Sequence, residues 1–325
     1  MGRYLLRRLL QVPIGLAVVG SLAFLLIHLA PGGPVTALSG EYATAELRQE
    51  IEQRYGLDRP LGQRYLAWAG AVLSGDLGRS YLHKAPVAEV ILERLPATLS
   101  IVLPAVFLSL LLGGAIGLVS TRPPGAARHR LAPLLALVGH MMPTFWIAQG
   151  LVLLFALKLG WFPVQGLDDP RAIAPSLGDR IRHLVLPVTA LAIHQLALMA
   201  LILRAALQAE VARPYMVTAL AKGLDFSRAR RRHALVNALH PVLAVMGGRI
   251  GATFVGAIAV ETVFALPGLG RLIVSAAINR DHPLVLGIAL AVCAVAMLGN
   301  LLTDLMMNRV DPRMAIDRDE ASHAA

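Results

Sequence analysis

The chain has 325 residues, of which 56% are hydrophobic and only 15% are charged, and its mean hydropathy is +0.64. Soluble domains carry about 25% charged residues, so this composition excludes an ordinary soluble protein and indicates a membrane protein. The formal net charge of +10 could suggest nucleic-acid binding. The basic residues, however, are concentrated in alternate loops, which indicates that membrane topology is the source of the charge.

Six apolar segments are long enough to cross a membrane, since about 20 helical residues span a ~30 Å hydrocarbon core. They cover residues 9–29, 99–119, 131–157, 184–203, 243–263 and 284–307. The first segment is too long for the core of a signal peptide, and Pro31 follows it where a cleavage site would be expected. We therefore expect an all-α polytopic membrane protein with six transmembrane helices, the first of them retained.

The charges of the loops predict the orientation. Residues 2–8 and 121–130 each contain three Arg and no acid, and residues 204–232 contain seven Lys or Arg and two acids. Residues 31–95 are balanced, with seven basic and eight acidic residues. By the positive-inside rule, we expect both termini and the basic loops to lie in the cytoplasm, with the chain as a multi-pass protein of a plasma (inner) membrane.

These observations predict five regions along the chain. We expect a cytoplasmic N-terminus over residues 1–8, a first transmembrane helix over 9–30, an external helical segment over 31–94, a membrane domain of five helices over 95–308, and a cytoplasmic tail over 309–325.

The external segment has its own helix signals. Thr44 is the expected N-cap of a first helix that places Leu47, Ile51 and Tyr55 on one face and ends at Gly56, and a second helix covers residues 61–73 before the turn "SGDLG". The segment is either a small cap on the outer membrane face or a docking surface for an external partner.

Glycines at helical spacing predict close packing between membrane helices. Gly113 and Gly117 in the second span, and Gly247 and Gly251 in the fifth, are separated by three residues. We expect these residues to serve packing, and we assign them no role in transport.

The sequence offers no catalytic constellation. It contains no H-E-x-x-H, no G-x-S-x-G and no G-x-x-x-x-G-K-[ST] motif. His28, His140 and His194 lie in separate spans without ligand spacing, so we interpret them as hydrogen-bonded structural residues, and the single Cys293 excludes an intrachain disulfide. We expect no metal site, no cofactor and no enzymatic activity in this chain, so active transport would need ATP hydrolysis by another chain.

One stretch interrupts the apolar pattern: "TALAKGLDFSRARRRHALVNALHP", residues 218–241, has five Lys or Arg and one acid. Its residues predict a helix over 215–222, a C′ position at Gly223, and a second helix capped by Asp225. The result is a short helix–turn–helix knob in the cytoplasm. The arginines that follow are expected mainly at anionic lipid head groups, with contacts to a partner protein as the alternative; they are Arg228, Arg230, Arg231 and Arg232.

This stretch resembles the cytoplasmic loop of binding-protein-dependent ABC importer permeases, in the form found in dipeptide and oligopeptide permeases. That form reads T-A-x-A-K-G-L and then R-H-A-L-x-N-A-L-x-P, and every fixed position is present here between Thr218 and Pro241. Against the general pattern E-A-A-x3-G-x9-I-x-L-P, the chain departs at Val217, Thr218, His233 and Val236, as the peptide branch usually does.

Other segments agree in the expected order, and the resemblance extends over nearly the whole chain as far as Arg313. They are "YLLRRLLQVP", "LAPGGPV", "YGLDRPLGQRYLAW", "GDLGRSY", "ERLPATL", "MPTFWIAQGLVLLF", "ETVFALPGLGRLIVSAAINRDHPLV" and "NLLTDLMMNRVDPR".

The resemblance implies the type I ABC importer permease fold and the first-permease branch of the peptide family. It implies a subunit that forms half of a translocation pathway for di- or oligopeptides, although related importers carry nickel, glutathione or oligosaccharides. The implied partners are a second homologous permease, two ATPase subunits that bind ATP and Mg, and an extracytoplasmic substrate-binding protein. The rival from another class is an ion-coupled secondary transporter, which would need ionisable groups at mid-membrane.

The resemblance also implies two sets of site residues. The loop over residues 205–240 would couple to the ATPase through Thr218, Ala219, Ala221, Lys222, Gly223, Leu224 and Asp225. The turn "ETVFALPGLGRL" would lie near an external gate as a re-entrant segment whose backbone is irregular at Pro267, Gly268 and Gly270, with a plain surface turn as the alternative. Its candidate residues are Glu261, Pro267, Gly268 and Gly270.

Arg249 is the remaining candidate, about two turns into the fifth span. An Arg in a membrane helix costs about 2.5–3.5 kcal/mol on insertion scales, so its side chain should face protein or water. Either it reaches the cytoplasmic interface or a carboxylate of the partner permease, or it lines the pathway and favours substrates with an anionic group.

Overall fold

The computed structural model describes residues 2–29, 35, 44–54, 56–120, 134, 137–169 and 176–310. The predicted basic loop 121–130, the tail from residue 311 onward and Tyr55 lie outside this part of the chain. In the described part the regular structure is helical, with a single isolated β-bridge between Arg79 and Pro86. The expected all-α class is confirmed.

The chain divides into two compact units. Unit 1 comprises Met1–Thr98 and Pro267–Leu298, and unit 2 comprises Leu99–Leu266 and Gly299–Ala325. Two long helices, α5 (Val87–Val119) and α13 (His282–Val310), contribute residues to both units.

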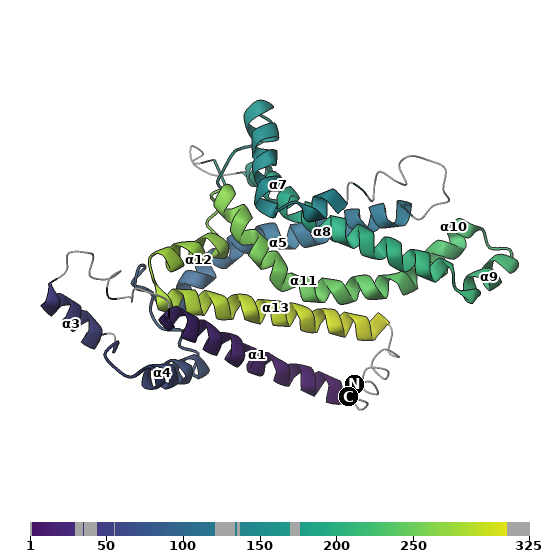
Figure 1. Cartoon of the computed structure of the whole chain (residues 1–325). Coiled ribbons are helices and arrows are strands. Elements are labelled where there is room, and N and C mark those ends of the chain that lie inside the picture. The colour runs from purple at the N-terminus through teal and green to yellow at the C-terminus, as the bar shows by residue number, and fades with distance from the viewer. Residues whose placement is uncertain are drawn as a thin grey trace. The chain divides into compact units, whose positions relative to one another are not determined.

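Unit 1 contains α1 (Gly2–Leu29), α3 (Ala45–Arg54), α4 (Leu61–Leu73), α12 (Leu269–Ile278) and the first parts of α5 and α13. Figure 1 shows α1 and α13 side by side, and Gly20 of α1 faces Leu290 of α13. The core of unit 1 joins the start of α5, α12 and the start of α13 through Val87, Val90, Ile91, Leu269, Leu272, Ala276, Leu284 and Ile288.

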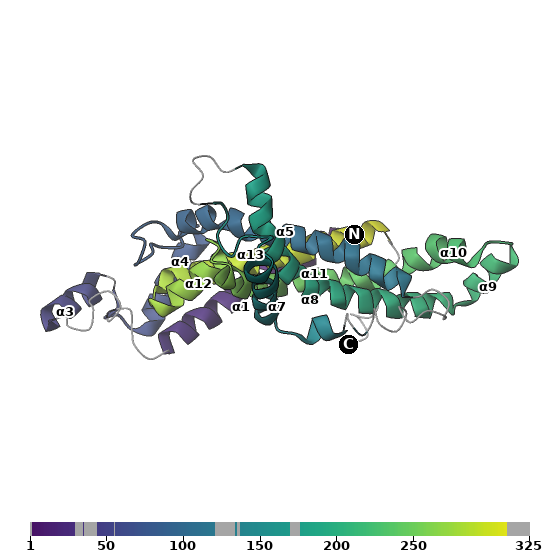
Figure 2. The ribbon, with the colours of Figure 1, turned by 90° about the horizontal axis from the view of Figure 1, so that it is seen from above.

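Unit 2 contains α7 (Thr144–Leu151), the π-helical segment η1 (Val152–Lys158), α8 (Leu177–Val211), α9 (Pro214–Ala221), α10 (Phe226–Ala229), the π-helical segment η2 (Arg230–Ala234) and α11 (Leu235–Val263). In both views α8 and α11 run side by side, and α9 and α10 lie together at one end of this pair (Figures 1 and 2). The core here is formed by Met199, Leu203, Leu207, Met216, Ala219, Ala229, Ala234, Ala238, Val242 and Met246.

Four helices within the described residues are long and apolar enough to cross a membrane: Leu9–Leu29, Val87–Val119, Leu177–Val211 and His282–Leu305. A fifth candidate, Phe226–Met246 with Gly251–Val263, is bent by 62°. The bend falls between Met246 and Gly251, a stretch that contains the pair Gly247 and Gly248, and paired glycines are a common cause of kinks because they leave the helix without side-chain support.

The predicted span 131–157 differs from the expectation. Residues 137–141 are helical, the helix breaks at Met142 and Pro143, and an apolar helix resumes as Thr144–Lys158. Proline lacks an amide hydrogen and clashes with the preceding turn, so it begins a new helix more readily than it continues one. This region is therefore not one continuous helix in the described part of the chain.

The two helices predicted between residues 44 and 73 agree with the sequence. α3 starts after Thr44, whose hydroxyl accepts a hydrogen bond from the Leu47 amide at 3.3 Å, and Gly56 adopts a φ of +61°. α4 has the predicted bounds Leu61–Leu73 and leads into a turn in which Gly75 and Gly78 both have positive φ.

The predicted packing role of the α5 glycines is confirmed inside unit 2. A Cβ on Gly113 would lie 2.7 Å from the Leu196 carbonyl oxygen of α8, and one on Gly117 would lie 3.0 Å from the Leu203 Cβ. The two backbones can approach only because these positions carry no side chain. The matching role of Gly247 and Gly251 stays a prediction.

Candidate functional site

The first candidate site is the end of α9. It forms a Schellman motif, in which the Gly223 amide donates to the Leu220 carbonyl at 2.9 Å and the Leu224 amide donates to the Ala219 carbonyl at 3.3 Å. Gly223 has a φ of +85°, a conformation that residues with a Cβ rarely adopt. The predicted C′ role of Gly223 is confirmed.

The second helix of this site begins as predicted. The Asp225 carboxylate accepts a hydrogen bond from the Ser227 amide at 3.0 Å and so caps α10. α9, the turn and α10 together form a knob, residues 214–229, on the end of the α8–α11 pair (Figure 1).

Most predicted coupling residues lie on the exposed side of the knob. Ala219 is buried and Leu224 is half-buried, whereas the exposed members are Thr218, Ala221, Lys222, Gly223 and Asp225. Two apolar side chains are exposed among them: Val217 at 67% and Leu220 at 40% of their surface. The knob therefore exposes two apolar side chains, here called the apolar patch, close in sequence to the cation Lys222.

A polar cluster around Tyr215 holds the knob to the helices behind it. The Tyr215 hydroxyl donates to the Glu210 carboxylate of α8 at 2.7 Å and accepts from the Asn237 side-chain amide of α11 at 3.3 Å. Glu210 also pairs with Arg213 at 3.1 Å. Burial, and then the hydrogen bond to Glu210, raise the pKa of the Tyr215 phenol, so the phenol remains a hydrogen-bond donor at neutral pH. Sequence reasoning missed Glu210 and Tyr215, although both lie within the predicted loop 205–240.

Arg230 corrects the prediction that the arginines after the knob face lipid head groups. Its surface is only 3% exposed, and its guanidinium donates to the Leu118 carbonyl near the C-terminus of α5 at 3.3 Å. A cation is favoured there because the carbonyls at a helix C-terminus carry partial negative charge. The other three predicted anchors, Arg228, Arg231 and Arg232, are exposed.

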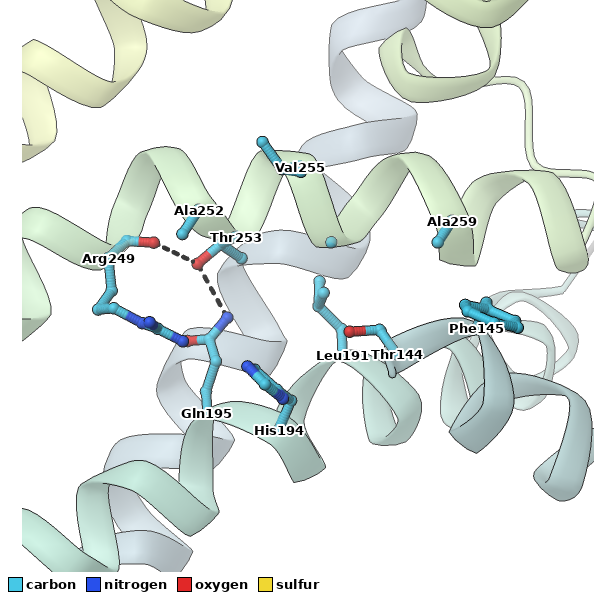
Figure 3. Close-up of a pocket in the computed structure, with 11 residues that line it drawn as sticks. Thr144, Phe145, Leu191, His194, Gln195, Arg249, Ala252, Thr253, Val255 and Ala259 are labelled. Atoms are coloured by element: carbon cyan, nitrogen blue, oxygen red, sulfur yellow. Dashed lines mark hydrogen bonds between the residues drawn. The ribbon is translucent and has the colours of Figure 1, made fainter. Parts of the chain in front are cut away.

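The second candidate site is a pocket of about 360 Å³ in unit 2 (Figure 3). α7, α8 and α11 supply its walls, and Arg249, His194, Gln195 and Thr253 gather at one end of it. The other lining residues are Thr144, Phe145, Leu191, Ala252, Val255, Gly256 and Ala259. The structure thus places the predicted residue Arg249, which is half-buried, in the lining of a pocket between three helices.

A chain of hydrogen bonds joins α8 and α11 beside Arg249. Gln195, which is buried, donates from its side-chain amide to the Thr253 hydroxyl at 2.8 Å, and that hydroxyl donates to the Arg249 carbonyl at 2.9 Å. Figure 3 shows both bonds at the end of the pocket that Arg249 occupies. They fix the backbone from which the arginine side chain extends.

His194 connects the pocket to His140. The two imidazole rings are 4.7 Å apart between centroids, and His194 is within electrostatic range of both His140 and Arg249. The Nδ1 atoms of both histidines are buried without a hydrogen-bond partner among the described residues. Within that part of the chain no group of three potential ligands could hold a metal ion.

The third candidate is the segment that follows α11. Glu261 is fully buried in unit 2 and is not among the residues that line the Arg249 pocket. A second Schellman motif ends the helix, with the Leu266 amide donating to the Glu261 carbonyl at 2.9 Å and Ala265 in the left-handed region at φ +51°. The Phe264 carbonyl accepts from the Gly166 amide at 2.9 Å, so the loop after η1 is attached to this turn.

The remaining residues of the predicted gate belong to unit 1. Gly268 precedes α12 in an extended conformation, and the Leu269 amide donates to the buried Thr98 hydroxyl of α5 at 2.8 Å. Gly270 lies inside α12. The expectation of irregular backbone at Gly270 is therefore wrong, because α12 begins one residue earlier than that expectation allowed.

Asp281 is an organising residue of unit 1 that sequence reasoning missed. It is fully buried, and its carboxylate accepts from the Ser80 hydroxyl at 2.5 Å, from the Leu82 amide at 3.0 Å and from the Leu284 amide at 3.2 Å. An Asp followed two residues later by a Pro at the start of a helix is an N-cap signal. That signal would have found the bond to Leu284 but not those to the loop before α5.

Comparison with known protein families identifies two families that this chain matches. The family described as "Binding-protein-dependent transport system inner membrane component" matches residues 105–316, and the one described as "Binding-prot-dependent transport system membrane comp, N-term" matches residues 1–102.

Three curated relatives align along almost their full length. The probable peptide ABC transporter permease protein y4tP of Sinorhizobium fredii is 34% identical over 314 residues, covering 97% of this chain and 99% of that protein. The oligopeptide transport system permease protein AppB of Bacillus subtilis is 33% identical over 316 residues, covering 97% and 99%. The dipeptide transport system permease protein DppB of Alkalihalophilus pseudofirmus is 35% identical over 331 residues, covering 96% and 98%. The chain belongs to the binding-protein-dependent ABC importer permeases, and it is a multi-pass, non-catalytic subunit of the inner membrane.

Proposed function

We propose that this chain forms half of the path by which an ATP-driven importer takes up di- and oligopeptides. The curated relatives are named as peptide, oligopeptide and dipeptide permeases, and the similarity extends over almost the whole chain. The complex would contain this chain, a second homologous permease, two ATPase subunits that bind ATP and Mg, and an extracytoplasmic binding protein. Both termini and the knob would face the cytoplasm, as the charge distribution predicts.

The observation that carries the coupling part of this proposal is the ordered knob with its exposed apolar patch. Val217 and Leu220 project from a helix that ends at a fixed Schellman turn, and the Tyr215 cluster ties that helix to α8 and α11. A patch of this kind, beside Lys222, suits a groove on an ATPase subunit. Because the knob is held by two long helices, movement of the ATPase would reach them as rigid-body motion.

The decisive experiment separates docking from folding. Val217→Glu puts a charge into the patch, while Leu66→Glu puts the same charge on α4 at a side chain of similar exposure, 70% against 67%. Co-purification of the ATPase subunits with detergent-solubilised permease should fall about tenfold for Val217→Glu and stay unchanged for Leu66→Glu, because burying one unpaired charge costs more than 1.4 kcal/mol. Equal retention of the ATPases by both variants would refute docking at the knob.

The substrate part is tested by transport. Complexes reconstituted into liposomes with the binding protein should take up radiolabelled di- and tripeptides when ATP is present. Labelled nickel, glutathione and an oligosaccharide are tested in parallel, because related importers carry them. Uptake of one of these without peptide uptake would replace the peptide assignment while keeping the importer.

We also propose that the turn after α11 contributes to an external gate. Leu266 and Leu269 are both buried, at 0% and 2% exposure. Cysteines at these two positions should therefore react with a maleimide only when the turn opens. Equal labelling of nucleotide-free and nucleotide-trapped complexes would exclude the gating role.

A further inference from the structure

The pocket of unit 2 carries one full positive charge and no acidic residue. Of its eleven lining residues, Arg249 is the cation, and neither Asp nor Glu is among them. His194, Gln195, Thr144 and Thr253 supply the other polar groups, and the rest of the wall is apolar. A pocket with this composition is complementary in charge to a ligand that brings a negative group.

The arginine has no anionic partner in the part of the chain that the structure describes. The ion pairs found there join Arg180 to Asp168, His183 to Asp179 and Arg213 to Glu210, and none involves Arg249. Arg249 lies in α11, which is otherwise almost uncharged along its membrane portion. A charge in that position is costly unless a partner or water compensates it, so the pocket is organised to receive a counter-ion.

Hydrogen bonds between α8 and α11 hold the backbone at Arg249 and leave its guanidinium available as a hydrogen-bond donor. The hydrogen bonds from Gln195 to Thr253 and from Thr253 to the Arg249 carbonyl hold the backbone, while the Arg249 side chain extends toward Gln195 (Figure 3). The buried Nδ1 atoms of His140 and His194 have no hydrogen-bond partner among the described residues. These two nitrogens have almost no accessible surface, and His140 does not line the pocket, so the case for a ligand rests on Arg249 and the polar groups of the lining.

The chemistry of the pocket favours a carboxylate. The planar guanidinium matches a carboxylate through two parallel hydrogen bonds. Phe145, Leu191 and Val255 line the pocket with apolar surface that suits an aliphatic or aromatic side chain next to that carboxylate. The volume of about 360 Å³ is within the range of small-ligand sites.

We propose that this pocket binds the terminal carboxylate of the substrate during its passage, with Arg249 as the counter-charge and Gln195 and Thr253 as positioning residues. The proposal rests on the assignment of the chain as a peptide permease, and it adds that the permease itself selects for a free carboxylate. The permease would then contribute to specificity beyond the selection made by the binding protein.

The test compares trialanine with its C-terminal amide in liposomes that contain the complete complex. Wild-type complex should take up trialanine faster than the amide. Arg249→Gln should lower that preference about tenfold, the factor that one charge-assisted hydrogen bond supplies. Arg249→Lys keeps the charge and should retain a large part of the preference. Arg204→Gln is the matched control, because it removes an arginine from α8 that does not line the pocket.

All four proteins use the same binding protein, so its own selectivity cancels when the ratios are compared between variants. An unchanged ratio in an active Arg249→Gln complex would overturn the proposal. If Arg249→Gln instead weakened assembly with the second permease and left the ratio intact, Arg249 would be a partner for a carboxylate of that subunit, and the proposal would also fail.

A second measurement does not depend on peptide transport. Millimolar N-acetylalanine should raise the thermal unfolding temperature of the wild-type complex, while N-acetylalanine amide should not, and Arg249→Gln should respond to neither. If neither peptide is transported but N-acetylalanine alone stabilises the wild type, the peptide assignment fails and the carboxylate site stands. If peptides are transported with an unchanged ratio and N-acetylalanine has no effect, the carboxylate site fails and the peptide assignment stands.

Discussion

The two units hold their helices together by different contacts. In unit 1, one buried carboxylate, Asp281, joins the loop before α5 to the start of α13 by three hydrogen bonds. In unit 2, α5 lies directly on α8 because Gly113 and Gly117 carry no side chain where the α8 backbone passes.

The difference follows from where each contact lies. Helices within lipid gain nothing from the hydrophobic effect when they associate, so they depend on close packing of their backbones. Asp281 precedes the membrane portion of α13, where loops and water compete for polar groups, and a buried carboxylate there must be fully hydrogen-bonded to be tolerated. The Asp281 contact of unit 1 thus depends on hydrogen bonds, whereas the α5–α8 contact of unit 2 depends on close packing. Each contact can be tested by a substitution to which it alone is sensitive.

The largest effect is expected for Asp281→Ala, which leaves a hydroxyl and two amides of unit 1 without their acceptor. We expect a loss of about 3 kcal/mol in the free energy of unfolding, since each unsatisfied buried group costs on the order of 1 kcal/mol or more. Asp76→Ala is the control, because Asp76 is exposed and accepts one bond, from the Gly78 amide. Denaturant unfolding of the detergent-purified protein measures both, and equal losses would contradict the role assigned to Asp281.

Gly113→Ala tests the packing of unit 2. The added methyl would meet the Leu196 carbonyl oxygen and force α5 away from α8, at a cost of about 2 kcal/mol for overpacking. Gly114→Ala on the same helix has open space and should gain up to about 1 kcal/mol from helix propensity. Opposite signs of the two changes in unfolding free energy are expected, and the same sign for both would refute close packing at Gly113.

A third pair of variants places the same backbone strain in each unit. Gly223 in unit 2 has a φ of +85° and Gly75 in unit 1 has a φ of +86°, and neither has an atom within 4 Å of its would-be Cβ. Valine at either position should cost about 1 kcal/mol through the left-handed conformation alone. Only Gly223→Val should also reduce substrate-stimulated ATP hydrolysis by the assembled complex. Full stimulation in Gly223→Val would remove the coupling role of the knob.

The smallest effect is expected for Tyr215→Phe, which removes one hydroxyl from the polar cluster behind the knob. The loss should be about 1 kcal/mol. The pKa of Tyr215 is raised in the folded protein, so the hydroxyl stabilises the fold below pH about 10, and this contribution disappears as pH rises through the folded-state pKa. The difference in unfolding free energy between wild type and Tyr215→Phe should therefore shrink above pH about 10. A constant difference would show that the hydroxyl contributes only packing.

Local signals in the sequence predicted the helices, the cap at Asp225 and the turn at Gly223, because each depends on residues within one or two turns. The hydrogen bonds that Asp281 accepts from Ser80 and Leu82 could not be predicted in the same way, since these residues lie about 200 residues away along the chain. The same reason explains the error at Arg230: the sequence shows a run of arginines but not that the end of α5 covers one of them. The pocket around Arg249 also depends on three helices whose register no local pattern fixes.

The hydrogen bond from the Gly166 amide to the Phe264 carbonyl joins two loops of unit 2 through backbone atoms alone. This bond does not depend on the side chains of the other loop residues. Position 166 itself favours glycine, because its φ is +89°, and Pro is excluded there because it has no amide hydrogen to donate. The rest of the loop can therefore change its surface while the turn after α11 keeps this anchor.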